Sequence, residues 1–332
     1  VPFMTRGRRA IEKEMPGTGP LYSSIAAFES GGIRMRLHQT HPNDGILLLQ
    51  GPVSPFISDS DPMVEGRPVA RIVPLAGNPE PERAGRTAAA LNDYLRYAHR
   101  VLKELEPNPG RRAGGLPEAN FLVTLRCGRR APQQPFEERW GLKGLFISSG
   151  AVFAGLAREL GLRFQKAEKA LDPEDEIRQR IRSALEDREH DFVHVHTKAP
   201  DEAAHTGDPL FKAQVLNSLD RGMDDLLEAL EERDDLLVAV TGDHSTPSLS
   251  PLIHSGEPVP LLLAGRTVRR DGVRTFDEVS AATGSLGYLK GKELMLTLLN
   301  HADRSTLFGH RLGRVERPYF PEHYEPFTLG DE

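Results

Sequence analysis

The sequence has very little cysteine, few aromatic residues and no long apolar run. A single cysteine, Cys127, in 332 residues excludes an intrachain disulfide and a zinc site built from several cysteines. No stretch is apolar over the length needed to cross a bilayer, and the N-terminus lacks a basic-then-apolar signal pattern, so we expect no membrane partner. Aromatic residues make up 6%, hydrophobic residues 38% and charged residues 27%. This composition is typical of a globular protein, and a cytoplasmic location is the simplest expectation.

The chain also lacks an excess of positive charge. Its 42 lysines and arginines are outnumbered by 48 acidic residues, which gives a net charge of -6. Without a global basic field, nucleic acid is not expected as a partner. Local basic clusters at residues 6–9 and 126–130 are typical of solvated surface, although an anionic substrate would need some of these side chains. The oligomeric state is not fixed by the sequence.

The length and the order of apolar segments predict two domains. The chain exceeds the roughly 150 residues typical of one domain, and we place the boundary between residues 140 and 141. A helix is predicted near residues 84–105 in the first part. In the second part, apolar strands at 191–196, 235–240 and 259–263 alternate with helices near 150–160, 173–186, 208–233 and 290–301. This alternation predicts an α/β fold with a mostly parallel sheet covered by helices on both faces.

Acidic residues and histidines follow two of these strands in a pattern typical of metal binding. Asp201 and His205 are four residues apart, Asp243 and His244 are adjacent at the end of the 235–240 strand, and His254 follows later. Each pair alone is a weak signal, because helix faces supply such pairs by chance. Carboxylates and imidazoles bind divalent cations, and two such cations can clamp a transferring phosphoryl group. Because open α/β sheets bind ligands at the carboxyl ends of their strands, we expect a metal centre there.

Residues 196–208, 241–247 and 254–260 resemble the archaeal-type cofactor-independent phosphoglycerate mutases of the alkaline phosphatase superfamily. The resemblance extends to residues 59–62, 118–122, 140–143, 276–278 and 284–287, and so covers most of the chain. It implies an alkaline-phosphatase-like sheet sandwiched by helices in residues 141–332 and a second, smaller α/β domain in residues 1–140. It also implies two divalent metal ions, with manganese preferred and zinc or cobalt as alternatives. The implied ligands are Asp201, His205 and His254 for one metal, and Asp243 and His244 for the other.

The resemblance gives further residues a role in binding a small phosphorylated substrate. The first domain is expected to grip the carboxylate end of a phosphoglycerate, and Arg126, after the apolar run 121–125, suits two-point binding of an anion. An ordinary surface salt bridge is an equal alternative for Arg126. Lys143 matches a family lysine that reaches the phosphoryl group, and a solvent-exposed lysine is the alternative. Lys198 is expected to contact phosphate or to orient Asp201. His196 is expected to pack in the core or to support a metal ligand through a hydrogen bond.

The nucleophile is the missing part of this set. In the resembled family, the second metal also binds an aspartate and a nucleophilic serine from an N-terminal strand and a Gly-Ser turn. These do not occur in the sequence, so we expect either that the chain is a fragment or that the protein has lost this segment. Thr18, in residues 16–20, is the local match to the turn. A threonine can act as an activated nucleophile, although this stretch is by default a loop.

The resemblance implies a metal-dependent mutase that interconverts 2- and 3-phosphoglycerate through a phosphoenzyme. Two alternatives remain open. The same metal ligands serve phosphatases and phosphodiesterases of the superfamily, and a homologue without its nucleophile would bind metal without catalysis.

Overall fold

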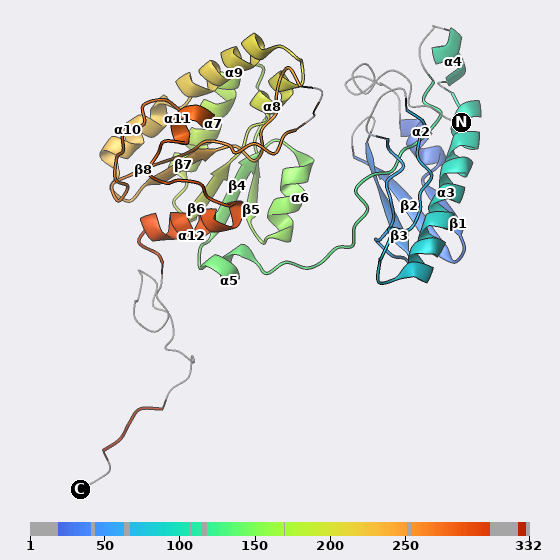
Figure 1. Ribbon diagram of the computed structural model, residues 1–332, viewed down its shortest axis with the longest axis horizontal. Coiled ribbons are helices and arrows are strands. Elements are labelled where there is room, and N and C mark those ends of the chain that lie inside the picture. The colour runs from blue at the N-terminus through green and yellow to red at the C-terminus, as the bar shows by residue number, and fades with distance from the viewer. Residues whose placement is uncertain are drawn as a thin grey trace. The chain divides into compact units, whose positions relative to one another are not determined.

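The computed structural model describes residues 19–40, 44–62, 67–106, 108–113, 118–168, 170–250, 252, 254–305 and 325–329. The chain forms two compact units, Val1–Pro132 and Gln133–Glu332 (Figure 1). The division precedes the boundary expected at 140/141, because helix α5 (Phe136–Trp140) belongs to the second unit. Phe136 packs in a core cluster with Phe146 and Leu162, and its amide donates to Leu160 O at 2.7 Å. Among the described helices, none combines the length and apolar character that a bilayer span requires.

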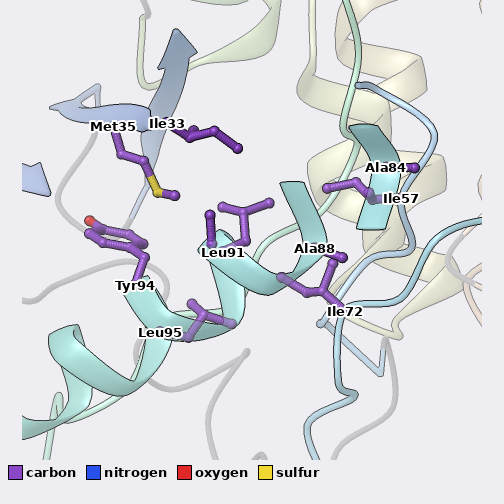
Figure 2. Packing of buried hydrophobic residues seen from close by; sticks show 10 residues of the cluster. Ile33, Met35, Ile57, Ile72, Ala84, Ala88, Leu91, Tyr94 and Leu95 are labelled. Carbon is purple, nitrogen blue, oxygen red and sulfur yellow. The ribbon is translucent and has the colours of Figure 1, made fainter. Parts of the chain in front are cut away.

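The first unit is an antiparallel sheet packed against one long helix. Strands β1 (Ala27–Ser30), β2 (Ile33–Gln39) and β3 (Gly45–Gln50) lie in that order, after the short helix α2 (Gly19–Ser24) and before α3 (Pro81–Glu104) and α4 (Asn108–Ala113). Alternate residues of β2, Ile33 and Met35, are buried against Leu91 and Tyr94 of α3 (Figure 2). The Tyr94 hydroxyl donates to Ile25 O at 2.9 Å within this unit. Helix α3 confirms the helix predicted near 84–105, and its buried apolar residues recur at helical spacing.

The second unit contains a parallel sheet with helices on both faces. Strand β4 (Gly144–Ser148) lies between β5 (Arg163–Lys166) and β6 (Phe192–Val195), and both pairings are parallel. One face packs against α6 (Ala151–Glu159) and α12 (Gly291–His301), and the other against α7 (Pro173–Glu186) and α8 (Ala199–Ala204). Phe192 joins the first cluster and Val195 the second, as the alternation of side chains along a strand requires. The predicted α/β architecture is therefore confirmed.

Strand β7 (Leu237–Thr241) does not pair as the sequence predicted. Its described partner is β8 (Leu261–Gly265), and the pairing is antiparallel. Contacts within the connecting loop explain this arrangement. Thr241 Oγ1 donates to Pro260 O at 2.9 Å, and Ser255 N donates to Ser245 O at 3.0 Å, so the two limbs of the loop run side by side and return the chain alongside β7.

The helix predicted over residues 208–233 is two helices, α9 (Pro209–Arg221) and α10 (Asp224–Glu232). The break falls at Gly222, where α9 ends against α7. A Cβ atom at Gly222 would lie 2.4 Å from Ile177 Cγ2 and 2.6 Å from Glu174 O. Such distances exclude any larger residue without movement of α7, so the glycine permits the close approach. A short helix, α11 (Glu278–Ala281), precedes α12.

Candidate metal centre

The predicted ligands are carried by segments that follow β6 and β7. Asp201 lies in the first turn of α8 and His205 is its C-cap residue, so the two are one helical turn apart. The His205 amide donates to Asp201 O at 3.1 Å, which closes this turn. Ala203, on the opposite side of α8, is buried against α7. This packing directs Asp201 and His205 toward the loop that follows β7.

The Asp201 carboxylate is the shared contact of the cluster. Its Oδ1 lies 3.3 Å from His205 Nε2 and 3.4 Å from His254 Nε2. Ligand atoms of Asp201, His244 and His254 all lie within 4.8 Å of one another. The ring centroids of His244 and His254 are 3.9 Å apart. Asp243 Oδ2 lies 3.5 Å from His244 Nε2. The structure therefore brings together side chains from three separate segments.

Thr246 is a site residue that the sequence analysis missed. Its side chain is buried, and its Oγ1 lies 2.9 Å from Asp201 Oδ1 and 3.1 Å from His244 Nδ1. A hydroxyl has one hydrogen, and an ionised carboxylate only accepts. Thr246 therefore donates to Asp201 and accepts from His244 Nδ1–H. This tautomer leaves the lone pair of His244 Nε2 free for a metal ion.

A signal for Thr246 was present in the sequence. It follows His244 by two residues, so in an extended segment both side chains point to the same side. Its backbone carbonyl accepts from Lys212 Nζ of α9 at 2.8 Å, which fixes the loop from outside the cluster. Lys212 was also missed, and no sequence pattern distinguishes it from other surface lysines.

The surroundings of Asp201 favour its ionised form. Burial alone would raise the pKa of this carboxyl, but the hydrogen bond from Thr246 and the neighbouring His205 outweigh it, and the pKa is lowered. Lys198 Nζ, 3.7 Å from Asp201 Oδ2, and His254 act in the same direction. A carboxylate held ionised is available as a metal ligand.

The donor set fits a divalent cation. One ionised carboxylate and several imidazoles converge, and the side chains of Asp201, His244 and His254 remain between 19% and 41% exposed, so an ion has access. Among the described residues, the two expected sets of metal ligands do not form two separate clusters. His244, expected with Asp243 in the second set, lies with Asp201 and His254 of the first. The assignment of ligands to individual metal ions stays a prediction.

His196 directly follows β6 and interacts electrostatically with Asp243. Its ring contacts that of Phe153, with centroids 3.9 Å apart. Burial, followed by repulsion from His194, lowers the pKa of His196 to about 4. A neutral ring packed against an aromatic side chain matches the expected core role.

The structure does not bring Lys143 to the cluster. It precedes β4, and Gly144 pairs with Phe192 at the start of β6. Because β4 and β6 are parallel, Lys143 lies at the amino end of the sheet, whereas Asp201 follows the carboxyl end. Its backbone is held there by Asp191, whose Oδ2 accepts from Lys143 N at 3.0 Å and whose N donates to Lys143 O at 2.9 Å. This position offers no support for a contact with phosphate at the cluster.

Arg126 belongs to the first unit and has an unusual backbone. Its φ is 59°, a left-handed conformation that is uncommon outside glycine and is often found at functional sites. Asp59 Oδ1 accepts from Arg126 N at 2.9 Å, and Ser60 N donates to Thr124 O at 2.9 Å. These bonds hold the loop while the Arg126 side chain is exposed. Thr18, the alternative nucleophile, lies outside the described residues.

Comparison with known proteins assigns the chain to a family. Residues 99–301 match the metalloenzyme superfamily, and residues 4–108 match 2,3-bisphosphoglycerate-independent phosphoglycerate mutase. An enzyme of that name, number 2 of Methanocaldococcus jannaschii, is 39% identical over 279 residues, which cover 83% of this chain and 62% of the relative. The enzyme of Methanococcus vannielii is 34% identical over 318 residues, which cover 92% of this chain and 75% of the relative.

A solved structure supports the same assignment. The cofactor-independent phosphoglycerate mutase of Thermoplasma acidophilum matches with a TM-score of 0.53 and 27% identity, over 90% of this chain and 75% of that one. This likeness agrees with the predicted alkaline-phosphatase-like fold, and the superfamily match indicates dependence on a divalent metal. The chain belongs to the 2,3-bisphosphoglycerate-independent phosphoglycerate mutases of the metalloenzyme superfamily.

Proposed function

We propose that this chain interconverts 2- and 3-phosphoglycerate through a phosphoenzyme, as a metal-dependent phosphoglycerate mutase. The observation that carries the proposal is the cluster centred on Asp201, which gathers carboxylate and imidazole donors from segments that follow β6 and β7. Names of relatives that match most of the chain support the substrate class. A cytoplasmic location accords with a small phosphorylated substrate and a single cysteine.

We further propose that the centre holds two divalent cations, with manganese preferred and zinc or cobalt as alternatives. Asp201, His205 and His254 would hold one, and Asp243 and His244 the other. The donor types support this assignment, because imidazole and carboxylate suit all three metals. Bound cations at this position would withdraw charge from the oxygens of a phosphoryl group.

The chain's own side chains would prepare the site for an anionic substrate. The Lys198 ammonium, 56% exposed beside Asp201, adds positive charge at the mouth of the cluster. Thr246 contacts both Asp201 and His244 and would hold these two side chains in a fixed relation. Both features act before any chemistry, by attracting the phosphate and by holding the ligands in place.

A mutase must also retain the phosphoglycerate while its phosphoryl group is on the enzyme. We propose that Arg126 of the first unit binds the carboxylate of this intermediate. Its exposed guanidinium suits two-point recognition, and Asp59 fixes its backbone. Lys143 was expected to reach the phosphoryl group, and a variant at this position would test that expectation separately.

The test is to supply the protein with 3-phosphoglycerate and Mn²⁺ and to follow 2-phosphoglycerate and inorganic phosphate by ³¹P NMR. Mutase activity predicts that 2-phosphoglycerate dominates. The metal content of His205→Ala and Asp243→Ala should fall, whereas His190→Ala, whose ring contacts Asp187 away from the cluster, should keep the wild-type content. Unchanged metal content in both cluster variants would contradict the ligand assignment.

The same experiment separates the alternatives. Release of phosphate without 2-phosphoglycerate would indicate a phosphatase, for which the metal donors are equally suited. Bound metal without turnover of either kind would indicate a metal-binding homologue without catalysis.

A further inference from the structure

A charged pair lies on the buried face of α7. The side chains of Glu176 and Arg180 are 5% and 2% exposed, and Glu176 Oε1 lies 2.9 Å from Arg180 Nη1. Removing two charges from water costs about as much free energy as their attraction returns, so a buried pair is a weak source of stability. What distinguishes this pair is the segment that it contacts.

Both members of the pair bind the segment between β6 and α8, Arg180 through a backbone carbonyl and Glu176 through a side-chain hydroxyl. Arg180 Nη1 donates to His196 O at 2.5 Å, and Thr197 Oγ1 donates to Glu176 Oε1 at 2.7 Å. The same Thr197 hydroxyl accepts from Ala199 N at 3.2 Å, at the first residue of α8. A continuous set of hydrogen bonds therefore joins α7 to the start of the helix that carries Asp201.

Helix α8 depends on such an anchor. It has six residues, fewer than a helix needs to be stable alone in water. Its far end is held by Ala203, which packs with Ile177 and Ile181 of α7. Its near end has no side-chain cap from its own N-cap residue, Lys198. The bonds from the buried pair fix this near end, and the first turn contains Asp201.

We infer that Glu176, Arg180 and Thr197 are positioning residues for the metal centre, which fix segment 196–199 and thereby the direction of the Asp201 carboxylate. The inference rests on the proposed function, because it requires a metal ion at Asp201. Partners that orient a metal ligand from outside typically change metal affinity about 10- to 100-fold when they are removed. None of the three is among the residues proposed to bind metal or substrate.

Measuring stability and metal affinity together separates a positioning role from a purely structural one. Replacing a buried ion pair by apolar residues of similar volume is often neutral or stabilising. Glu176→Leu combined with Arg180→Met should therefore keep the wild-type midpoint of urea unfolding or raise it, yet weaken Mn²⁺ binding at least tenfold. Thr197→Val removes only the hydroxyl and should also weaken binding about tenfold, and Thr197→Ser should restore it.

The same helix offers a matched control. Glu174 and Arg178 have the same spacing as Glu176 and Arg180, and their Oε1 and Nη2 atoms are also 2.9 Å apart. Each is 24% exposed, and their described contacts include Arg221 at the end of α9. Glu174→Leu combined with Arg178→Met should leave Mn²⁺ affinity unchanged.

The experiment measures Mn²⁺ affinity by calorimetry on metal-free protein, with urea unfolding and hydrogen exchange of residues 196–205 on the same samples. We expect weaker binding and faster exchange in the Glu176/Arg180 and Thr197→Val variants, and wild-type values in the control. Wild-type affinity in both test variants would overturn the inference and leave the proposed function intact. Equal losses in test and control variants would also overturn it. A wild-type protein that binds no Mn²⁺ would overturn the proposed metal centre, and the inference with it.

Discussion

Replacing Thr246 with valine should weaken metal binding while leaving the fold intact. The side chains have nearly the same shape, so the change removes the hydroxyl that joins Asp201 to His244. Thr246 is 4% exposed, so solvent has little access to replace the lost bonds. In the variant, Asp201 loses its donor and His244 loses the acceptor that fixes its tautomer.

Two independent estimates give the size of the effect. A hydrogen bond to a charged group contributes about 1.5–3 kcal/mol. Loss of an outer partner of a metal ligand weakens metal affinity about 10- to 100-fold, and each factor of ten corresponds to about 1.4 kcal/mol. The two estimates of the lost binding free energy therefore agree. We therefore expect the Mn²⁺ dissociation constant of Thr246→Val to rise by about one to two orders of magnitude.

The assay is calorimetric titration of metal-free protein with Mn²⁺. Thr246→Ser, which keeps the hydroxyl, should bind close to wild type. Thr297→Val serves as control, because Thr297 Oγ1 donates only to Glu293 O of its own helix among the described contacts. Wild-type affinity in Thr246→Val, or an equal loss in Thr297→Val, would refute the reasoning.

Three further outcomes follow from the structure. Chelation of the metal should lower the thermal midpoint of the protein, and Mn²⁺ at 100 times its dissociation constant should restore about 2.7 kcal/mol of stability; an unchanged midpoint would argue against binding to the folded state. The folded pKa of His196, about 4, lies below its unfolded value, so its contribution to stability is present above pH 6.5 and lost as the pH falls toward 4. Metal-free protein should thus lose roughly 2 kcal/mol more over this range than His196→Gln, as measured by urea unfolding. Gly222→Ala should destabilise the second unit by about 1–3 kcal/mol, because the added methyl meets Ile177 and Glu174 O; a wild-type unfolding midpoint would contradict the close packing.

Sequence reasoning selected residues that the structure gathers in one cluster, because their positions follow from local rules. The i, i+4 spacing of Asp201 and His205 requires only one helical turn, which α8 provides. Asp243 and His244 follow a strand whose apolar run was plain in the sequence. Convergence of these segments then follows from the rule that strand ends form binding sites in α/β folds.

The pairing of β7 was not predictable in the same way. A run of apolar residues identifies a strand but not its partner or its direction. The antiparallel return depends on loop contacts such as Thr241 with Pro260, which join residues far apart in sequence. The break between α9 and α10 has a similar origin, because Gly222 is compatible with a helix until Ile177 is known to lie against it.

The buried pair of α7 shows most clearly what the sequence cannot distinguish. Glu174 with Arg178 and Glu176 with Arg180 have the same composition and spacing, and each stands beside the apolar stripe of Ile177 and Ile181. With about 100° per residue, one pair flanks this stripe on each side, so helical periodicity gives no reason to bury one rather than the other. The choice is made by segment 196–199, which presents a carbonyl and a hydroxyl to one side of α7 only. The position of the segment that follows β6 thus determines which charges are buried, and the same segment leads directly to Asp201.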